Sequence, residues 1–333
     1  MTTTASPSQP RRTEVTAAYD LGVDAYVALW SPVILPAAQA VVAALAPGHA
    51  ARILDVGTGS GALVPAIGAA AADVTVVGLD ASAEMLQRCR SAAGIPAIRC
   101  DALSLPIRDA AVDAVLLAFV LFHLSDPVQA VAEAARVLTY GGLVGTATWA
   151  RDGPMEADEV WDETLTEAGA PPLPAGRVDA ALDSEDAIGG LLAGAGLRPT
   201  RIWLEPLCHR WGLPAFYRFA TGSGRNRQRL QQLNAGQRGE VLDQVLKRLR
   251  ALDPDAFAWS GEVVCAVATL SMLGMKVVTA ELPVHVAPSS RIASAARFFQ
   301  PVISGRSRTP GRAVRSVQYG PVHGSVPPEH RRP

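Results

Sequence analysis

Three aspartates at the ends of apolar runs are the residues of this sequence with the clearest chemical potential. Asp55 lies inside a short apolar run, Asp80 ends a β-branched run, and Asp101 directly follows a third apolar segment. The carboxyl ends of parallel strands meet at one edge of a sheet, where ligands bind. We therefore expect the three carboxylates to form a cradle for a ligand with positive charge and with hydroxyl or amino groups.

The segment Gly57-Thr58-Gly59-Ser60-Gly61 follows the first acidic strand and predicts a tight turn into a helix at 62–72. The first two glycines let backbone approach a ligand, and the third lets the helix pack close to the strand. A dinucleotide site presents its helix N-terminus to a pyrophosphate, which a carboxylate at Asp55 would repel. The pattern therefore favours a cationic ligand group, with a generic strand-to-helix turn of another α/β protein as the alternative.

With this pattern the sequence resembles the class I methyltransferases that use S-adenosyl-L-methionine (SAM), whose first motif is acid-x-Gly-x-Gly-x-Gly. The stretch from Asp101 to Ile107 resembles the Asp-Ala-x-x-Leu-Pro-Phe signature of small-molecule methyltransferases related to the ubiquinone and menaquinone enzymes, with Ile107 replacing Phe. A Leu-x-x-Gly-Gly step at Leu138 also matches. The resemblance covers residues 53–149 and implies SAM as cofactor and methyl transfer to O, N or C of a small metabolite.

The resemblance and the chain order together give a set of cofactor contacts. Asp80 is expected to accept hydrogen bonds from the ribose diol, since Ser82 already caps the next helix. Asp101 is expected to accept a hydrogen bond from the adenine amino group. Met85 is expected to contact the adenine ring as an apolar side chain, with packing in the core as the alternative. The predicted cofactor-binding residues are Asp55, Gly57, Thr58, Gly59, Gly61, Asp80, Ala81, Met85, Asp101, Ala102, Leu103, Ala118 and Phe119.

An acceptor pocket is expected where the fourth strand, 111–120, runs into His123. Methyl transfer needs in-line positioning more than a base, but a hydroxyl acceptor must lose a proton, and His123 is the best-placed titratable group. Its alternatives are a pocket wall or a structural hydrogen bond. The predicted pocket residues are Tyr19, Tyr26, His123 and Phe216; the two tyrosines are otherwise helix-core aromatics.

The order of apolar runs predicts an α/β fold with a mostly parallel sheet and helices on both faces. The resemblance implies that this fold is Rossmann-like and seven-stranded, with a helical lid and a cap. We expect a disordered N-terminus at 1–13, a lid at 14–50 broken near Ser31, a SAM-binding domain at 51–270 and a disordered basic tail at 287–333. A helical cap insert at 213–252 separates the last two strands. Its arginines at 225, 227 and 229 are expected on a solvated face or against an acidic substrate.

Composition restricts the partners. The chain has 333 residues, 49% of them hydrophobic, and a formal net charge of −1, which gives no general attraction to nucleic acid or anionic membrane. The four cysteines form no Cys-x-x-Cys pair, so we expect reduced thiols and no metal site. The polar N-terminus lacks the apolar stretch of a signal peptide. We expect a cytoplasmic protein whose partner is a small-molecule methyl acceptor; the sequence is silent on oligomeric state.

Two other functions share part of this pattern. An NAD-dependent oxidoreductase has the same fold class, but the glycine spacing and Asp55 oppose it. A non-enzymatic SAM-binding protein would keep the acidic strand ends and lack a pocket for an acceptor.

Overall fold

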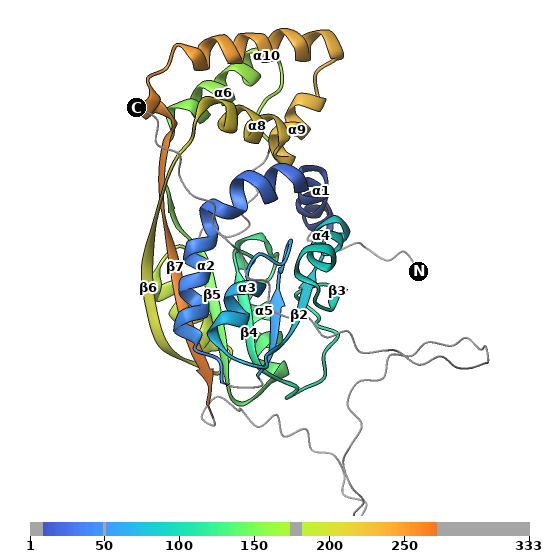
Figure 1. Cartoon of the computed structure of the whole chain (residues 1–333), viewed down its shortest axis with the longest axis vertical. Helices are drawn as coiled ribbons and strands as arrows, with labels where there is room; N and C mark the ends of the chain where they lie inside the picture. The colour runs from blue at the N-terminus through green and yellow to red at the C-terminus, as the bar shows by residue number, and fades with distance from the viewer. Residues whose placement is uncertain (1–8, 49–50, 174–181, 272–333) are drawn as a thin grey trace, which may run out of the picture. The chain divides into compact units, whose positions relative to one another are not determined.

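The strands of the described residues form a single seven-stranded sheet in the order β3-β2-β1-β4-β5-β7-β6 (Figure 1). The computed structural model describes residues 9–48, 51–173 and 182–271, all within one compact unit. Strands β1 to β5 pair in parallel, and β7 lies antiparallel between β5 and β6. The strands are β1 Arg52–Val56, β2 Thr75–Asp80, β3 Ala97–Arg99, β4 Val112–Ala118, β5 Leu138–Asp152, β6 Leu197–Arg210 and β7 Ala258–Leu270. The predicted fold class is confirmed.

Helices cover both faces of this sheet because successive strand residues point to opposite sides. Ile53 belongs to the core under α2 and α3, whereas its neighbour Leu54 belongs to the core under α5 and α7. Strand β4 is buried on both faces, through Ala114 and Leu116 on one and Val115 and Leu117 on the other, as expected for a central parallel strand. The helices on the sheet are α2 Ser31–Leu45, α3 Val64–Ala70, α4 Ala83–Ala93, α5 Pro127–Val137 and α7 Glu185–Gly194.

The N-terminal segment is helical from its first described residue. Helix α1 spans Gln9–Ala25, so the expectation that residues up to 13 are disordered is wrong for 9–13. Pro10 lies in the first turn, where a proline interrupts no helical hydrogen bond. The predicted break near Ser31 is a π-helical turn, Tyr26–Trp30, that leads directly into α2. Residues 1–8 and the predicted tail at 287–333 lie outside the described residues.

One helix of the described residues, Glu14–Leu45, is long and apolar enough to cross a membrane by length and composition alone. Its α2 portion buries Val33, Ile34 and Val41 in the core beneath the sheet. Its α1 portion lies over the carboxyl ends of the strands, beside α4 (Figure 1). The α2 portion is thus a core helix, and the α1 portion has the position of a lid.

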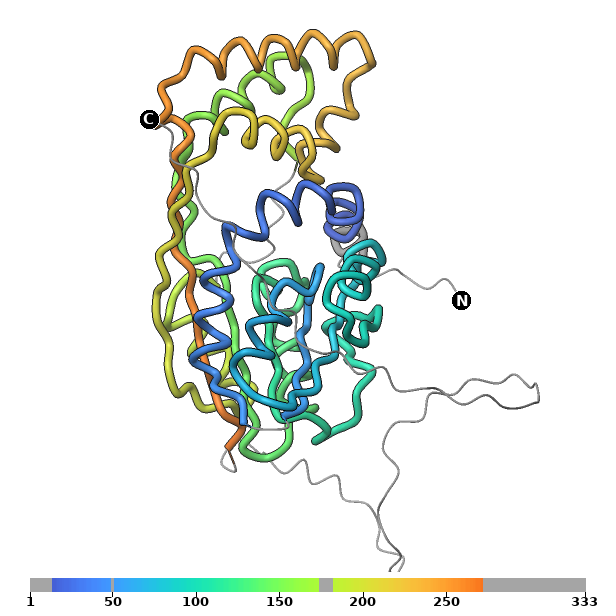
Figure 2. Tube along the Cα trace, in the orientation of Figure 1, coloured from blue at the N-terminus to red at the C-terminus, as the bar shows by residue number. Residues whose placement is uncertain are grey.

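A helical layer stands at one end of the sheet, above β5, β6 and β7 (Figure 2). It contains the predicted insert between β6 and β7, and α6 adds to it from the segment after β5. Strands β6 and β7 are paired as far as Arg210 and Ala258, so the insert leaves and re-enters the sheet at neighbouring residues. We call the cap the helices α6 Glu156–Glu167, α8 Leu213–Gly222, α9 Gly224–Gln231 and α10 Ala235–Arg250.

The cap arginines serve the structure of the cap. Arg229 is 3% exposed, forms an ion pair with Asp162 of α6 and donates to the Ala170 carbonyl oxygen at 3.0 Å. Arg225 and Arg227 donate to the Leu173 and Leu21 carbonyl oxygens. Arg229 therefore fits neither a solvated face nor a substrate contact; it joins α9 to α6.

Candidate functional site

A cavity opens at the carboxyl ends of β1, β2 and β4, beneath α1 and the π-helical turn, with about 840 Å³ of empty space including its mouth. A smaller cavity, lined by Asp55 and Thr58, adjoins it and shares Tyr26, Gly59 and Phe119 with it. Ligand sites of open α/β sheets lie in this position. The predicted residues that line the larger cavity are Tyr19, Tyr26, Gly57, Gly59, Asp80, Ala81, Met85, Asp101, Ala102, Ala118, Phe119 and His123.

Asp55 is a buried carboxylate at the inner end of the site. It is 2% exposed, and its Oδ2 accepts a hydrogen bond from the Thr58 hydroxyl at 2.8 Å. Burial raises the pKa of Asp55 to about 6, the Thr58 hydrogen bond acts in the opposite direction, and the charge of Asp80 adds to the rise. A bound cation would stabilise this carboxylate, so the site fits the ammonium or sulfonium of SAM.

The three glycines of the turn all have positive φ, but they serve different purposes. A Cβ at Gly59 would meet nothing within 4 Å, because this residue faces the cavity. A Cβ at Gly57 would lie 2.6 Å from Val120, and one at Gly61 would lie 2.9 Å from the Cβ of Ala93 in α4. Gly61 therefore permits packing between the turn and α4, and it lines neither cavity; its predicted cofactor contact stays a prediction.

Asp80 occupies the position predicted for a ribose contact. Its Oδ2 accepts from the Gly59 backbone N–H at 2.9 Å, and its Oδ1 accepts from that of Ser82 at 2.8 Å. Each carboxylate oxygen has two lone pairs, so both can accept a further bond from a diol. Burial raises the pKa of Asp80, and the backbone hydrogen bonds oppose that rise. Ser82 caps α4 through Met85, as expected.

Asp101 and Ala102 lie at the cavity, but Leu103 does not. The Leu103 backbone N–H donates to Asp101 Oδ1 at 3.1 Å, and its carbonyl oxygen accepts from Gln129 of α5 at 3.3 Å. Leu103 thus does not line the cavity, and its side chain packs against the core under α5; its predicted adenine contact stays a prediction.

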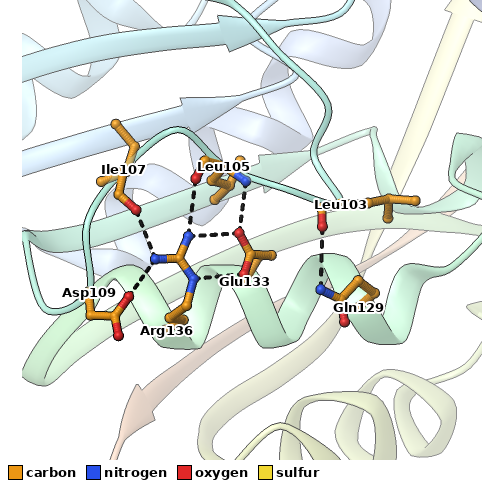
Figure 3. Close-up of polar contacts among 7 residues, drawn as sticks. All are labelled: Leu103, Leu105, Ile107, Asp109, Gln129, Glu133 and Arg136. Carbon is orange, nitrogen blue, oxygen red and sulfur yellow. Dashed lines mark hydrogen bonds and ion pairs between the residues drawn. The ribbon is translucent and has the colours of Figure 1, made fainter.

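Two residues of α5 hold the loop that follows Asp101 (Figure 3). Arg136 donates to the carbonyl oxygens of Ile107 and Leu105 at 2.8 and 3.1 Å, and pairs with both oxygens of Glu133 at 2.7 Å. Glu133 in turn accepts from the Leu105 backbone N–H at 2.8 Å. Arg136 is the main cause of the lowered pKa of Glu133. The i,i+3 spacing of this pair was the available sequence signal.

Tyr19 contacts both Tyr26 and His123, and all three residues line the same cavity. The Tyr19 hydroxyl is hydrogen bonded to His123 Nε2 at 2.8 Å. The Tyr19 ring lies edge-on to both neighbours, with centroids 5.3 Å from Tyr26 and 5.4 Å from His123. Burial raises the pKa of Tyr19 and of Tyr26, so both phenols are neutral donors near neutral pH.

Phe119 also lines the cavity, and its backbone conformation is unusual. Its φ is +58°, and its N–H donates to the Ala147 carbonyl oxygen at 2.8 Å. Positive φ at a bulky residue is strained and is concentrated at functional sites. Phe216, by contrast, is fully buried in the cap against Phe257, with ring centroids 5.6 Å apart. Its predicted place in the substrate pocket is wrong.

Behind Phe119 lies a group of tryptophans that the sequence did not bring together. Phe119 contacts Trp149, with centroids 5.2 Å apart, and Trp149 contacts Trp30 at 6.2 Å. Trp30 stacks on Trp211 and on Phe219 of α8 at 6.4 and 5.4 Å. These aromatic rings connect the cavity wall to the cap.

No group of three or more His, Cys, Asp or Glu side chains within residues 9–48, 51–173 and 182–271 is placed to hold a metal ion.

Comparison with known proteins matches the part of the chain that contains Asp55, Asp80 and Asp101. Residues 54–145 match the family model of a methyltransferase domain. A demethylmenaquinone methyltransferase of Deinococcus radiodurans is 41% identical over 96 residues, which are 27% of this chain and 40% of that protein. An uncharacterised methyltransferase of Mycobacterium tuberculosis is 40% identical over 111 residues, covering 32% of this chain and 44% of that protein. The chain thus spans less than half the length of these relatives.

Among solved structures, the [4+2]-cyclase SpnF superposes with a TM-score of 0.51 at 18% identity, over 77% of this chain and 95% of that chain. At this identity the likeness shows the fold alone. The matched family implies SAM as the cofactor.

Proposed function

From the premise that residues 54–145 form a class I SAM-dependent methyltransferase domain, we propose that this protein transfers a methyl group from SAM to an O, N or C atom of a small metabolite in the cytoplasm. One observation carries the proposal: a single cavity is lined by Asp80 and Asp101 and also by Tyr19, which is hydrogen bonded to His123. The near-neutral net charge supports a small molecule, rather than nucleic acid or a membrane, as acceptor.

The acidic residues would hold the cofactor. Asp80 would accept from the ribose hydroxyls, Asp101 from the adenine amino group, and Asp55 would offset the positive charge of the amino-acid portion. Gly59 would leave room for the ligand against the backbone. When bound, SAM supplies both the methyl group and the leaving group.

The aromatic residues and His123 in the cavity lining would position the acceptor. Tyr19 and Tyr26 exclude water above the cavity, and Phe119 fixes its apolar wall. Holding the nucleophile about 3–3.5 Å from the methyl carbon, in line with the bond that breaks, supplies most of the acceleration. For a hydroxyl acceptor, the proton would pass to the Tyr19 hydroxyl oxygen as the new bond to oxygen forms, while the Tyr19 proton moves to His123 Nε2.

The test is an assay of the purified protein with methyl-labelled SAM and a metabolite extract, with the product identified by mass. We expect labelled product, and binding of S-adenosylhomocysteine (SAH) in calorimetry. Asp80→Asn should weaken SAH binding, whereas Asp243→Asn, at an exposed position of the cap, should not. Absence of both SAH binding and product would overturn the proposal.

Two intermediate results would favour the other functions. Binding of SAH without turnover on a broad panel of acceptors would favour a non-enzymatic SAM-binding protein. A nicotinamide-linked absorbance change without SAM binding would favour an oxidoreductase.

A further inference from the structure

Helix α1, which carries Tyr19, touches the cap backbone to backbone. At the junction of α8 and α9, a Cβ on Gly224 would lie 1.8 Å from the carbonyl oxygen of Ala18. A Cβ on Gly22 would lie 2.5 Å from the Gly224 backbone nitrogen. Real Cβ contacts are never this short, so α1 can approach the cap this closely only because both positions lack side chains. Arg227 of α9 also donates to the Leu21 carbonyl oxygen at 2.9 Å.

A second contact anchors the end of the π-helical turn. The Trp30 ring stacks on Trp211 at an interplanar angle of 3° and on Phe219 at 17°. It also meets Trp259 edge-on, with centroids 5.5 Å apart. Aromatic pairs at these distances add to the apolar area that they bury. Of these rings, Phe219 belongs to the cap, Trp211 lies just before α8 and Trp259 lies in β7. The segment between Ala18 and Trp30 therefore contacts the cap at both ends, through Gly224 and through Phe219.

Both tyrosines of the cavity follow directly on residues that touch the cap. Tyr19 follows Ala18, whose carbonyl oxygen faces Gly224. Tyr26 follows Ala25, whose Cβ would lie 2.7 Å from a Cβ on Gly222. A helix presents successive residues to directions about 100° apart, so one short segment can contact the cap with one residue and the cavity with the next.

We infer that the cap positions Tyr19 and Tyr26 over the acceptor, with Gly222 and Gly224 as the positioning residues. This inference rests on the proposed function. Neither glycine lines the cavity, so each would act through α1 and not by touching a ligand. A displacement of the helix by a methyl group would move the Tyr19 hydroxyl away from His123 Nε2, which now lies 2.8 Å from it.

An exchange of side-chain size tests this inference directly. Gly222→Ala introduces a methyl group against Ala25, and adding Ala25→Gly removes the methyl group that it meets. We expect Gly222→Ala to lower kcat about 10- to 100-fold, the loss that a misplacement near 1 Å produces, with little change in the Kd of SAH. The double variant should recover to within a few-fold of wild type. Gly239→Ala in α10, where a Cβ would meet nothing within 4 Å, is the matched control.

Two further measurements separate positioning from loss of fold. Hydrogen exchange of residues 14–30 should rise in Gly222→Ala and return to the wild-type level in the double variant. In a Tyr19→Phe background, Gly222→Ala should lower kcat by a much smaller factor than in wild type, because the side chain that it displaces no longer has a hydroxyl group. Full kcat with unchanged exchange in Gly222→Ala, or no recovery in a folded double variant, would overturn the inference. If wild type lacks turnover, the proposed function fails, and the exchange data still decide whether the cap holds α1.

Discussion

Replacing Asp55 by Asn should stabilise the ligand-free protein and weaken its binding of SAM. Asp55 is 2% exposed, and burial raises its pKa from the usual 3.8 to about 6. A shift of this size corresponds to about 3 kcal/mol of folding free energy lost when the carboxylate ionises. Asn has the same shape, bears no charge and can still accept the Thr58 hydrogen bond, so the variant should recover up to that amount at pH 7.

The sign of the pH dependence follows from the direction of the shift. Because the folded-state pKa of Asp55 lies above the unfolded value, the folded protein binds more protons between pH 3.8 and about 6. Its contribution to stability therefore falls as the pH rises through that window and is constant above it. Affinity for SAM should change in the opposite direction, since only the ionised carboxylate attracts a cation, and should fall as the pH drops below about 6.

Urea unfolding from pH 4 to 8 and calorimetry with SAM measure the two effects. Asp113→Asn is the matched control, because the Arg52 hydrogen bonds lower the pKa of Asp113 to about 2 and its loss should destabilise the protein at pH 7. The difference between wild type and Asp55→Asn should grow as the pH rises and then level off. An Asp55→Asn protein that is less stable than wild type at pH 7, or that binds SAM equally well, would refute the reasoning.

Three other substitutions have clear expected outcomes. Arg136→Met should cost about 2 kcal/mol in urea unfolding, after allowance for its partial exposure, and should weaken SAH binding because the loop after Asp101 loses its anchor; an unchanged midpoint and Kd would contradict this. Gly59→Ala should raise the Kd of SAH, and Gly61→Ala should lower the melting temperature further than Gly59→Ala, since both residues have positive φ but only the methyl group at position 61 meets α4; the reverse order would refute the distinction. Arg229→Met should destabilise the cap by about 3 kcal/mol, because it leaves buried acceptors unpaired, while Arg218→Met at an exposed position of α8 should change unfolding little.

Local patterns in the sequence were sufficient to predict the strands and the acidic residues at their carboxyl ends. The buried apolar runs around Asp55 and Asp80 and the Ser82 cap each depend on residues within a few positions of one another. Strand order then brings the acidic ends together without further information, because parallel neighbours end at one edge of the sheet. Tyr19 and His123 were both predicted to line the acceptor pocket, but their hydrogen bond to each other was not predicted.

The errors arise where one local pattern permits two orientations. Phe216 lies on the apolar face of an amphipathic helix, and only the position of Phe257 decides that this face points into the cap and not into the cavity. Arg229 is part of an arginine-rich segment that is solvated in many proteins, but Asp162, far away in the sequence, draws it into the interior. The start of α1 was missed because polar composition was taken as disorder although the residues continue a helix.

The way in which the cap joins the sheet has a consequence for how this chain can change over evolution. The part of the cap inserted between β6 and β7 leaves and re-enters the sheet at the paired residues Arg210 and Ala258, so lengthening or replacing this insert adds little loop-closure entropy and leaves the pairing of β6 with β7 intact. The helices of the insert can therefore change between related proteins while residues 54–145 stay the same. Any replacement insert would still need a glycine where Gly224 contacts the Ala18 carbonyl oxygen. This contact therefore restricts which inserts the chain can accept.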